Sequence, residues 1–250
     1  MNLILCEPQD VGLDGLVVLT GDRAAHVRGV LRARPGDAVR IGVVDGPKGS
    51  GEVLALDADR GTVTLRCDLG ATTPPVPPID LLLALPRPKV LRRLWAQLAA
   101  LGVGRIRLTN AEKVERHYFD THVLDEATYR PLLIEGLQQA ADTRLPRVSI
   151  HRQFRILVED ELGPAPSDER RLVAHPGRGP SPAALPPDAR QRTLVAIGPE
   201  GGWNAFELGL LERAGFAAIS LGPRILRTDT ACIAILALLH AQQPSGSPPP

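Results

Sequence analysis

The sequence is poor in aromatic residues, in cysteine and in excess charge. Phe, Trp and Tyr make up only 3% of its 250 residues, so the core must consist mainly of Leu, Val, Ile and Ala. Three cysteines, Cys6, Cys67 and Cys232, lie far apart without a C-x-x-C pair, so neither a disulfide framework nor a metal site is expected. The formal net charge of +1 argues against gross electrostatic adhesion to nucleic acid, although a local basic patch is compatible with it.

The sequence also lacks a long hydrophobic run. Its apolar stretch from Ala231 to Leu239 is far shorter than the roughly 18 residues that a membrane span needs. The beginning, MNLILCEPQD, has no basic region before a long apolar segment. Together with the sparse cysteines, these features predict a soluble protein of the reducing cytoplasm that does not enter a membrane.

Proline marks one boundary. Residues 71–78, ATTPPVPP, hold four prolines and are typical of an extended linker. Before them, alternation of apolar and polar residues with turns at Asp45-Gly46 and at 59–61 predicts antiparallel hairpins that close a small barrel. After them, apolar runs alternate with helical stretches, which predicts parallel strands buried on both faces. The expected fold is therefore α/β, with a β-barrel over 1–72, an α/β domain over 73–243 and a disordered tail over 244–250.

Helical spacing locates the helices of the second half. Leucines recur every three or four residues over 89–101, which predicts an amphipathic helix, and further helices are expected over 129–142 and 205–216. A last helix is predicted from Asp229 to about Gln242, with Thr228 as its N-cap. It is apolar almost all round, so a second subunit is expected to cover part of it.

Two glycine-containing turns stand out. IGPEGG, residues 197–202, and LGPRILRTDTA, residues 221–231, each follow a short apolar run. Glycine lets the backbone approach a ligand closely, and the carboxyl ends of strands are where open α/β sheets bind ligands. An isolated GPEGG would more often be a tight connection, but two such turns favour a shared pocket. Phosphate-loop motifs are absent, and Leu221, Ile225 and Leu226 suit a flat, weakly charged heterocycle such as adenine.

These two turns, about twenty residues apart, closely resemble the signature of the small-subunit ribosomal RNA uracil-N3 methyltransferases, which belong to the SPOUT class. Upstream, HVRGVLRARPGD followed by a DG hairpin is similar to the N-terminal barrel of that family, which is related to the PUA RNA-binding fold. The resemblance implies a C-terminal trefoil knot that holds S-adenosylmethionine, a homodimer, and ribosomal RNA or the small ribosomal subunit as partner. It implies a cofactor site formed by Ala174, His175, Ile197, Gly198, Pro199, Glu200, Gly201, Leu221, Gly222, Ile225 and Leu226.

Methylation of N3 of a neutral uracil requires loss of its proton. Glu200 is a candidate to accept that proton, and Arg224 or Arg227 could stabilise the anionic ring oxygens or hold a neighbouring phosphate. Each has a purely structural alternative: Glu200 could accept N–H bonds within its own turn, and the arginines could form ordinary ion pairs. No metal is required.

RNA contacts are expected from the small domain. In DRAAHVRGVLRA, residues 22–33, a helix would present an apolar stripe of Val27, Val30 and Leu31 and project Arg28 and Arg32 together. With Arg34 these arginines would form a basic edge, although a solvated helix face explains them equally well.

The chain departs from the family pattern in segments 93–119 and 135–146, and Asp229 replaces the more usual Glu. The cofactor pocket is therefore expected to transfer better than the target nucleotide. Two alternatives stay open: a knotted methyltransferase for another RNA position, and a catalytically inactive RNA-binding factor of ribosome assembly.

Overall fold

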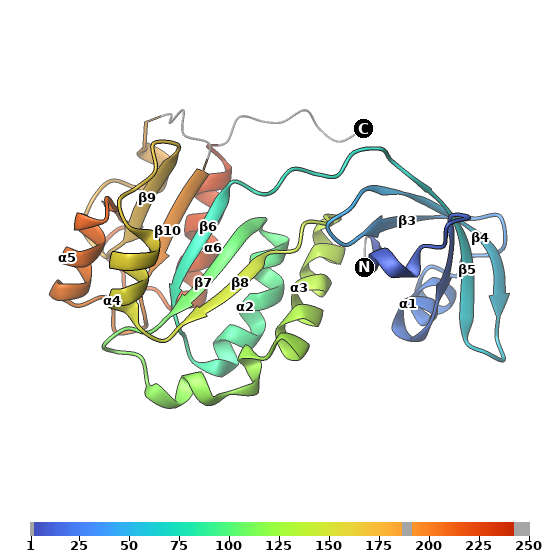
Figure 1. Cartoon of the computed structure of the whole chain (residues 1–250), viewed down its shortest axis with the longest axis horizontal. Helices are drawn as coiled ribbons and strands as arrows, with labels where there is room; N and C mark the ends of the chain where they lie inside the picture. Colours follow the sequence, from blue (N-terminus) through green and yellow to red (C-terminus); the bar gives the residue numbers. More distant parts are fainter. Residues whose placement is uncertain (1–2, 187–191, 243–250) are drawn as a thin grey trace. The chain divides into compact units, whose positions relative to one another are not determined.

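The computed structural model describes residues 3–186 and 192–242, which form two compact units (Figure 1). The first contains Met1–Val76 together with Leu133–Leu145, and the second contains Pro77–Leu132 and Pro146–Pro250. The tail predicted over 244–250 lies outside the described residues.

The first unit is built on a curled, half-barrel sheet. Its strands are β1 (Ile4–Cys6), β2 (Leu16–Leu19), β3 (Ala38–Val43), β4 (Lys48–Asp57) and β5 (Thr62–Leu69), in the order β1-β3-β4-β5-β2. Among the described strands of this unit, β1 and β3 pair in parallel and the other pairs are antiparallel. The predicted antiparallel hairpins are confirmed, and left-handed residues stand in both turns, Asp45 at φ 55° and Gly61 at φ 68°. The 3-10 turn η1 (Pro8–Asp10) follows β1.

The helix predicted over 22–33 differs from expectation. Regular α-helix α1 spans Gly21–Ala25 and continues as a π-helical turn, η2 (His26–Val30). A π turn holds more residues than an α turn and rotates the side chains that follow. Val27 is buried, but Val30 and Leu31 are 69% and 44% exposed, so the predicted apolar stripe is wrong. Arg32 has φ 51° and lies beyond the helix, so it does not share the i,i+4 spacing with Arg28.

The segment Leu133–Leu145 belongs with the sheet of the first unit. It includes the end of helix α3 (Glu126–Ala140), where the carbonyl of Gln138 accepts a hydrogen bond from the Leu3 amide at 3.2 Å. The Thr143 hydroxyl is fully buried and donates to the carbonyl of Gly46 at 2.7 Å. A Cβ on Gly42 would lie 2.7 Å from the Thr143 methyl, so this contact requires glycine.

The second unit contains a six-stranded sheet in the order β11-β9-β10-β6-β7-β8. Every neighbouring pair is parallel, as the apolar runs predict. The strands are β6 (Ile79–Ala84), β7 (Val103–Thr109), β8 (Arg147–His151), β9 (Glu169–Ala174), β10 (Arg192–Ile197) and β11 (Ala217–Ile219).

Two helices pack against this sheet, one on β7 and the other on β6 and β10. The first, α2 (Pro88–Ala100), buries Leu91, Leu94 and Leu98, as predicted. No helix in the described part of the chain is long and apolar enough to cross a membrane. The remaining helical segments are α4 (Phe154–Ile156) with η5 (Leu157–Leu162), α5 (Ala205–Arg213), α6 (Thr228–His240), and the short turns η3 (Arg116–Asp120), η4 (His122–Leu124) and η6 (Pro182–Ala184).

The start of α6 corrects one prediction. Arg227, not Thr228, occupies the N-cap position, and its side chain makes no capping bond. Thr228 is the first helical residue, and only 3% of it is exposed because it faces inward.

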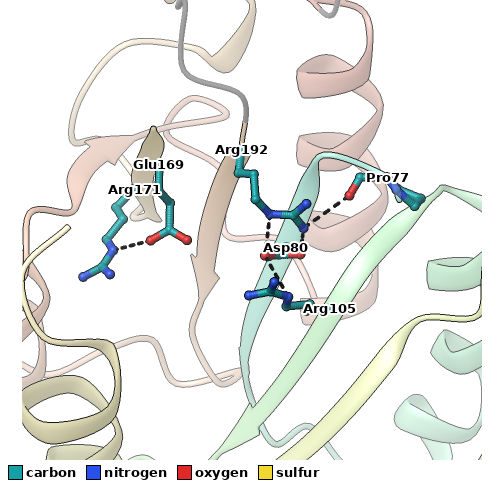
Figure 2. A network of polar contacts seen from close by, with 6 residues as sticks. All are labelled: Pro77, Asp80, Arg105, Glu169, Arg171 and Arg192. Atoms are coloured by element: carbon teal, nitrogen blue, oxygen red, sulfur yellow. Dashed lines mark hydrogen bonds and ion pairs between the residues drawn. The ribbon is translucent and has the colours of Figure 1, made fainter. Parts of the chain in front are cut away.

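The other face of the sheet carries charge. The carboxylate of Asp80 on β6 is fully buried between two strands, where Arg192 of β10 donates to it at 2.6 Å and 3.3 Å (Figure 2). Arg192 also donates to the carbonyl of Pro77 at 3.3 Å, and Arg105 of β7 lies 3.9 Å from the carboxylate. The strands are buried on both faces, as predicted, but the buried run of β6 includes a charged residue. Ion pairing compensates Asp80 in the interior.

A second buried pair lies on β9. Nε of Arg171 donates to Glu169 at 2.7 Å (Figure 2). Its Nη1 donates to the carbonyls of Gly163 and Ala214 at 2.6 Å and 2.9 Å, and its Nη2 donates to the carbonyl of Leu162 at 3.1 Å. Its guanidinium is nearly saturated with acceptors, which a buried cation needs.

Arg192→Met is expected to lower the free energy of unfolding by about 3 kcal/mol, because the Asp80 carboxylate would stay buried without its main partner. Urea unfolding measures this loss. The double variant Asp80→Leu with Arg192→Met should recover most of it, since a well-packed apolar pair can replace a buried ion pair. A single variant as stable as the parent would contradict the prediction.

Candidate active site

One pocket lies at the carboxyl ends of β9, β10 and β11 in the second unit. It encloses about 820 Å³ of space, part of which is open to solvent. Its walls come from the two glycine-containing turns, from the end of β9 and from one face of α6. The structure brings all eleven predicted cofactor residues to this pocket: Ala174, His175, Ile197, Gly198, Pro199, Glu200, Gly201, Leu221, Gly222, Ile225 and Leu226.

The first turn is held by side chains beneath it. A Cβ on Gly198 would lie 3.1 Å from the indole of Trp203, so glycine allows the turn to rest closely on that ring. Lys113 donates to the carbonyl of Gly201 at 2.7 Å. These contacts fix the backbone that follows β10.

The helix after this turn begins with a capping box. Asn204 accepts from the amide of Glu207 at 2.8 Å, and Glu207 accepts from the amide of Asn204 at 2.8 Å. The second carboxylate oxygen of Glu207 accepts from the amide of Glu112 at 2.7 Å. One buried carboxylate therefore ties the loop after β7 to the start of α5.

The second turn depends on Ser220. The hydroxyl of this residue accepts from the amides of Gly177 and Gly222, each at 3.0 Å. Gly222 has φ 98°, a conformation that side chains rarely adopt, and nothing lies within 4 Å of the position that its Cβ would take. At the end of β11, the carbonyl of Ile219 accepts from the amide of His175 at 2.9 Å. The turn is thus joined to the end of β9.

Trp203 is a pocket residue that the sequence analysis missed. It is only 5% exposed, and its ring centroid lies 5.2 Å from that of Phe154. The indole Nε1 is buried and has no hydrogen-bond partner among the described residues. A buried donor without an acceptor is costly, so this N–H is suited to a polar group in the pocket.

Other missed lining residues come from α6. Thr228, Ala231 and Ile235 are spaced by three and four residues, so they share one helix face. That spacing is a signal in the sequence that could have identified them. Pro176, Gly202 and Ile219 also line the pocket.

The predicted catalytic residues are placed differently from one another. Glu200 lines the pocket, its side chain is 37% exposed, and its carboxylate lies 3.4 Å from Nε of Arg87. Within the described chain, no amide of its own turn donates to this carboxylate. Arg224 also lines the pocket and is exposed, whereas Arg227 occupies the N-cap position of α6 and stands outside the lining.

The predicted RNA-contacting residues lie in the first unit. Arg28 is half-buried, and its Nε has no partner among the residues described. Arg32 and Arg34 are exposed. The three arginines are therefore close in sequence but do not form the single helical edge that was expected.

Thiol chemistry is not supported by the cysteines. Burial raises the pKa of the Cys6 thiol to about 11 and also raises the pKa of Cys232, so both stay protonated at neutral pH.

Across residues 3–186 and 192–242, no group of three or more potential metal ligands occurs.

Comparisons with known proteins agree with the sequence resemblance. The family model for the RNA methyltransferase domain matches residues 72–240. Ribosomal RNA small subunit methyltransferase E of Treponema pallidum is 31% identical and aligns over 96% of this chain and 92% of its own length. The protein of the same name from Mycobacterium bovis is 26% identical, over 88% and 84% of the two chains.

Solved structures show the same fold. A ribosomal RNA small subunit methyltransferase E from Neisseria gonorrhoeae, bound to S-adenosyl methionine, superposes with a TM-score of 0.75 at 22% identity, covering 96% of this chain and 97% of that one. A probable rRNA-methyltransferase from Porphyromonas gingivalis gives 0.74 at 22% identity, covering 97% and 98%.

This likeness confirms the predicted fold class, a PUA-like β unit with a SPOUT-type α/β unit, while the knot itself stays a prediction. The resemblance found in the two turns is confirmed by relatives that align over nearly the whole chain. The chain therefore belongs to the RNA methyltransferase family, in the group of ribosomal RNA small subunit methyltransferase E.

Proposed function

We propose that the protein transfers the methyl group of S-adenosylmethionine to N3 of a uridine in small-subunit ribosomal RNA. The observation that carries this proposal is the single pocket in which all eleven expected cofactor residues meet. A relative of the same group was solved with S-adenosyl methionine bound. Bound in this pocket, the cofactor would supply an electrophilic methyl group.

The pocket fits such a cofactor in shape and chemistry. Its apolar residues Leu221, Ile225 and Leu226 suit the adenine ring, and the open space beside Gly222 admits a ligand against the backbone. The unpartnered N–H of Trp203 offers a donor to a polar group of the ligand.

The residues around the pocket suggest how the uracil proton is handled. Glu200 is the candidate acceptor, and its ion pair with Arg87 holds the carboxylate at the pocket. Arg224 lines the same pocket, and its guanidinium would stabilise the negative charge that develops on the ring oxygens. Arg227 lies outside the lining, which suits contact with a neighbouring phosphate better. This reaction uses no metal.

The experiment that tests the reaction is mass mapping of modified nucleosides in ribosomal RNA from a deletion strain, with and without complementation. Loss of 3-methyluridine that the intact gene restores supports the proposal. A different lost modification would indicate a methyltransferase for another RNA position. Unchanged RNA would favour the inactive assembly factor, against which the complete pocket lining argues.

We further propose that the first unit binds RNA through Arg28, Arg32 and Arg34. Arg28 has a buried Nε that lacks a partner among the described residues, and the other two arginines are exposed. Contact with ribosomal RNA would place the protein in the cytoplasm, where its three free cysteines stay reduced.

Gly222→Val should lower the affinity for S-adenosylmethionine at least tenfold, because valine resists φ 98° and its side chain would occupy the open side of the turn. Calorimetry measures the affinity. Gly36→Val is a matched control, since Gly36 has φ 92° and equally open surroundings but lies in the first unit. Undiminished affinity in folded Gly222→Val would exclude this pocket as the cofactor site.

Arg28→Ala combined with Arg32→Ala should weaken RNA binding and reduce its salt dependence, because fewer counterions would be released. Titrations of a labelled RNA at several salt concentrations measure the slope. Arg66→Ala serves as control, because Arg66 is an exposed arginine of the same unit that pairs with Glu52. An unchanged slope in the double variant would assign the two arginines to a solvated surface.

We also propose that the working enzyme is a homodimer that uses α6. Much of this helix is core, since Ile235, Leu236 and Leu239 are buried, but Ile233 is 37% exposed and Ala237 lies exposed one turn further on. An exposed apolar stripe beside the pocket is suited to a second copy of the chain.

Ile233→Asp should therefore give an inactive monomer or aggregate, because a charge would be buried in an apolar interface. Light scattering and methyl transfer are measured on the same sample. Ile156→Asp on α4, where Ile156 is 42% exposed, controls for a new surface charge. A parent protein that is fully active as a monomer at assay concentration would refute the dimer.

A further inference from the structure

The sheet of the second unit carries a group of arginines that the proposed pocket does not use. Arg105 and Arg107 are two residues apart on β7, so their side chains point to the same face. Arg147 on β8 is in register with Arg105 and shares that face. We call Arg105, Arg107 and Arg147 the arginine row.

The carboxylates on this face already form ion pairs with other arginines. Asp80 receives two hydrogen bonds from Arg192, and its distance to Arg105 is 3.9 Å, longer than a hydrogen bond. Glu169 pairs with Arg171 at 2.7 Å. Arg107 and Arg147 form no ion pair with any described residue. The row thus holds more positive charge than its surroundings compensate.

Arg107 is the member of the row that has a buried nitrogen atom without a partner among the described residues. Its Nη1 is buried without a hydrogen-bond partner in the described part of the chain, and the Thr109 hydroxyl two residues further along β7 is in the same state. Burial lowers the pKa of Arg107, the charge of Asp80 opposes this shift, and the charge of Arg105 adds to it. Like charges side by side on adjacent strands also repel each other. An anion bound here would give the Arg107 nitrogen and the Thr109 hydroxyl a hydrogen-bond partner, and it would reduce the repulsion between the arginines.

The arginine row has the chemical groups and the position that binding of a polyanion requires. Guanidinium groups bind phosphates in a planar, two-pronged manner, and three of them in succession match repeated single negative charges. Arg105 is 43% exposed at its side chain and Arg147 is exposed, so solvent reaches the row. From Arg105, strand β7 continues past Arg107 to its last residue, Thr109, at the carboxyl edge of the sheet. Ile197 of β10 lines the pocket at the same edge.

We propose that the arginine row binds the phosphodiester backbone of the substrate RNA and leads it along β7 toward the pocket. This inference rests on the proposed function, because it takes RNA as the substrate. It adds a second RNA-contacting surface, on the methyltransferase unit, to the arginines of the first unit.

The test uses Arg107→Met and Arg147→Gln in the full chain, with Arg213→Gln as control. Arg213 is an exposed arginine on α5, outside the row. The probe is a fluorescently labelled, uridine-containing transcript of small-subunit ribosomal RNA, and its binding is measured by anisotropy at several salt concentrations. Affinity for S-adenosylmethionine and thermal stability are measured for each variant.

Each row variant should bind the transcript on the order of tenfold more weakly, and its log–log salt slope should fall by about one, as for one lost phosphate contact. Arg107→Met should melt at a higher temperature than the parent, because a partly buried cation without a partner is replaced by an apolar side chain. Cofactor affinity should not change, and Arg213→Gln should match the parent throughout.

Unchanged RNA affinity and slope in both row variants would overturn the inference, whether or not the parent methylates RNA. If instead the row variants lose their subunit association in light scattering but bind RNA normally, the row is a subunit contact and the inference is wrong. A parent protein that binds the cofactor but neither binds nor methylates the transcript would contradict the proposed function as well.

Discussion

The ion pair between Asp80 and Arg192 joins the two central strands on which the site depends. Asp80 stands near the start of β6, Arg192 is the first residue of β10, and the pair closes at 2.6 Å with the carboxylate fully buried. In the register between β6 and β10, Leu194 lies beside Asp80 and Ile197 lies beside Leu83. The first glycine turn therefore emerges at the carboxyl edge of the sheet, next to the turn that follows β11. A charge buried at the opposite end of these strands is thus part of what positions the pocket.

The pocket is formed mainly by backbone that can lie close to a ligand, and less by reactive side chains. Gly198 rests on the indole of Trp203, and Gly222 takes a left-handed conformation that leaves the space beside it open. Ser220 and Glu207 supply the hydrogen bonds that keep these turns in place. A ligand bound here would meet main-chain groups on two sides. Such a site tolerates changes in the surrounding sequence, which accords with relatives that share less than a third of their residues with this chain.

Much of this arrangement could be predicted from the sequence, since each feature has a local signal. Apolar runs mark the parallel strands, leucine spacing marks α2, and the turns with Gly198 and Gly222 mark the pocket. Features that depend on irregular backbone geometry or on contacts between distant residues could not be predicted. The π turn after Ala25 exposes Val30 and Leu31 because of backbone geometry that side-chain spacing does not encode. Asp80 appears in an apolar run, and its partner Arg192 lies 112 residues away.

The charged side chains on one face of the sheet differ in how well partners compensate their charge. Arg171 and Asp80 are buried and saturated by partners, as stability demands of an interior charge. Arg107 is half-buried, yet its Nη1 has no partner within the described residues. Folding alone would favour an apolar side chain at this position, so a charge kept at a cost to stability is better explained by a bound anion. In an enzyme that must hold a long polyanion while it reads one base, such uncompensated arginines are expected near the pocket but outside it.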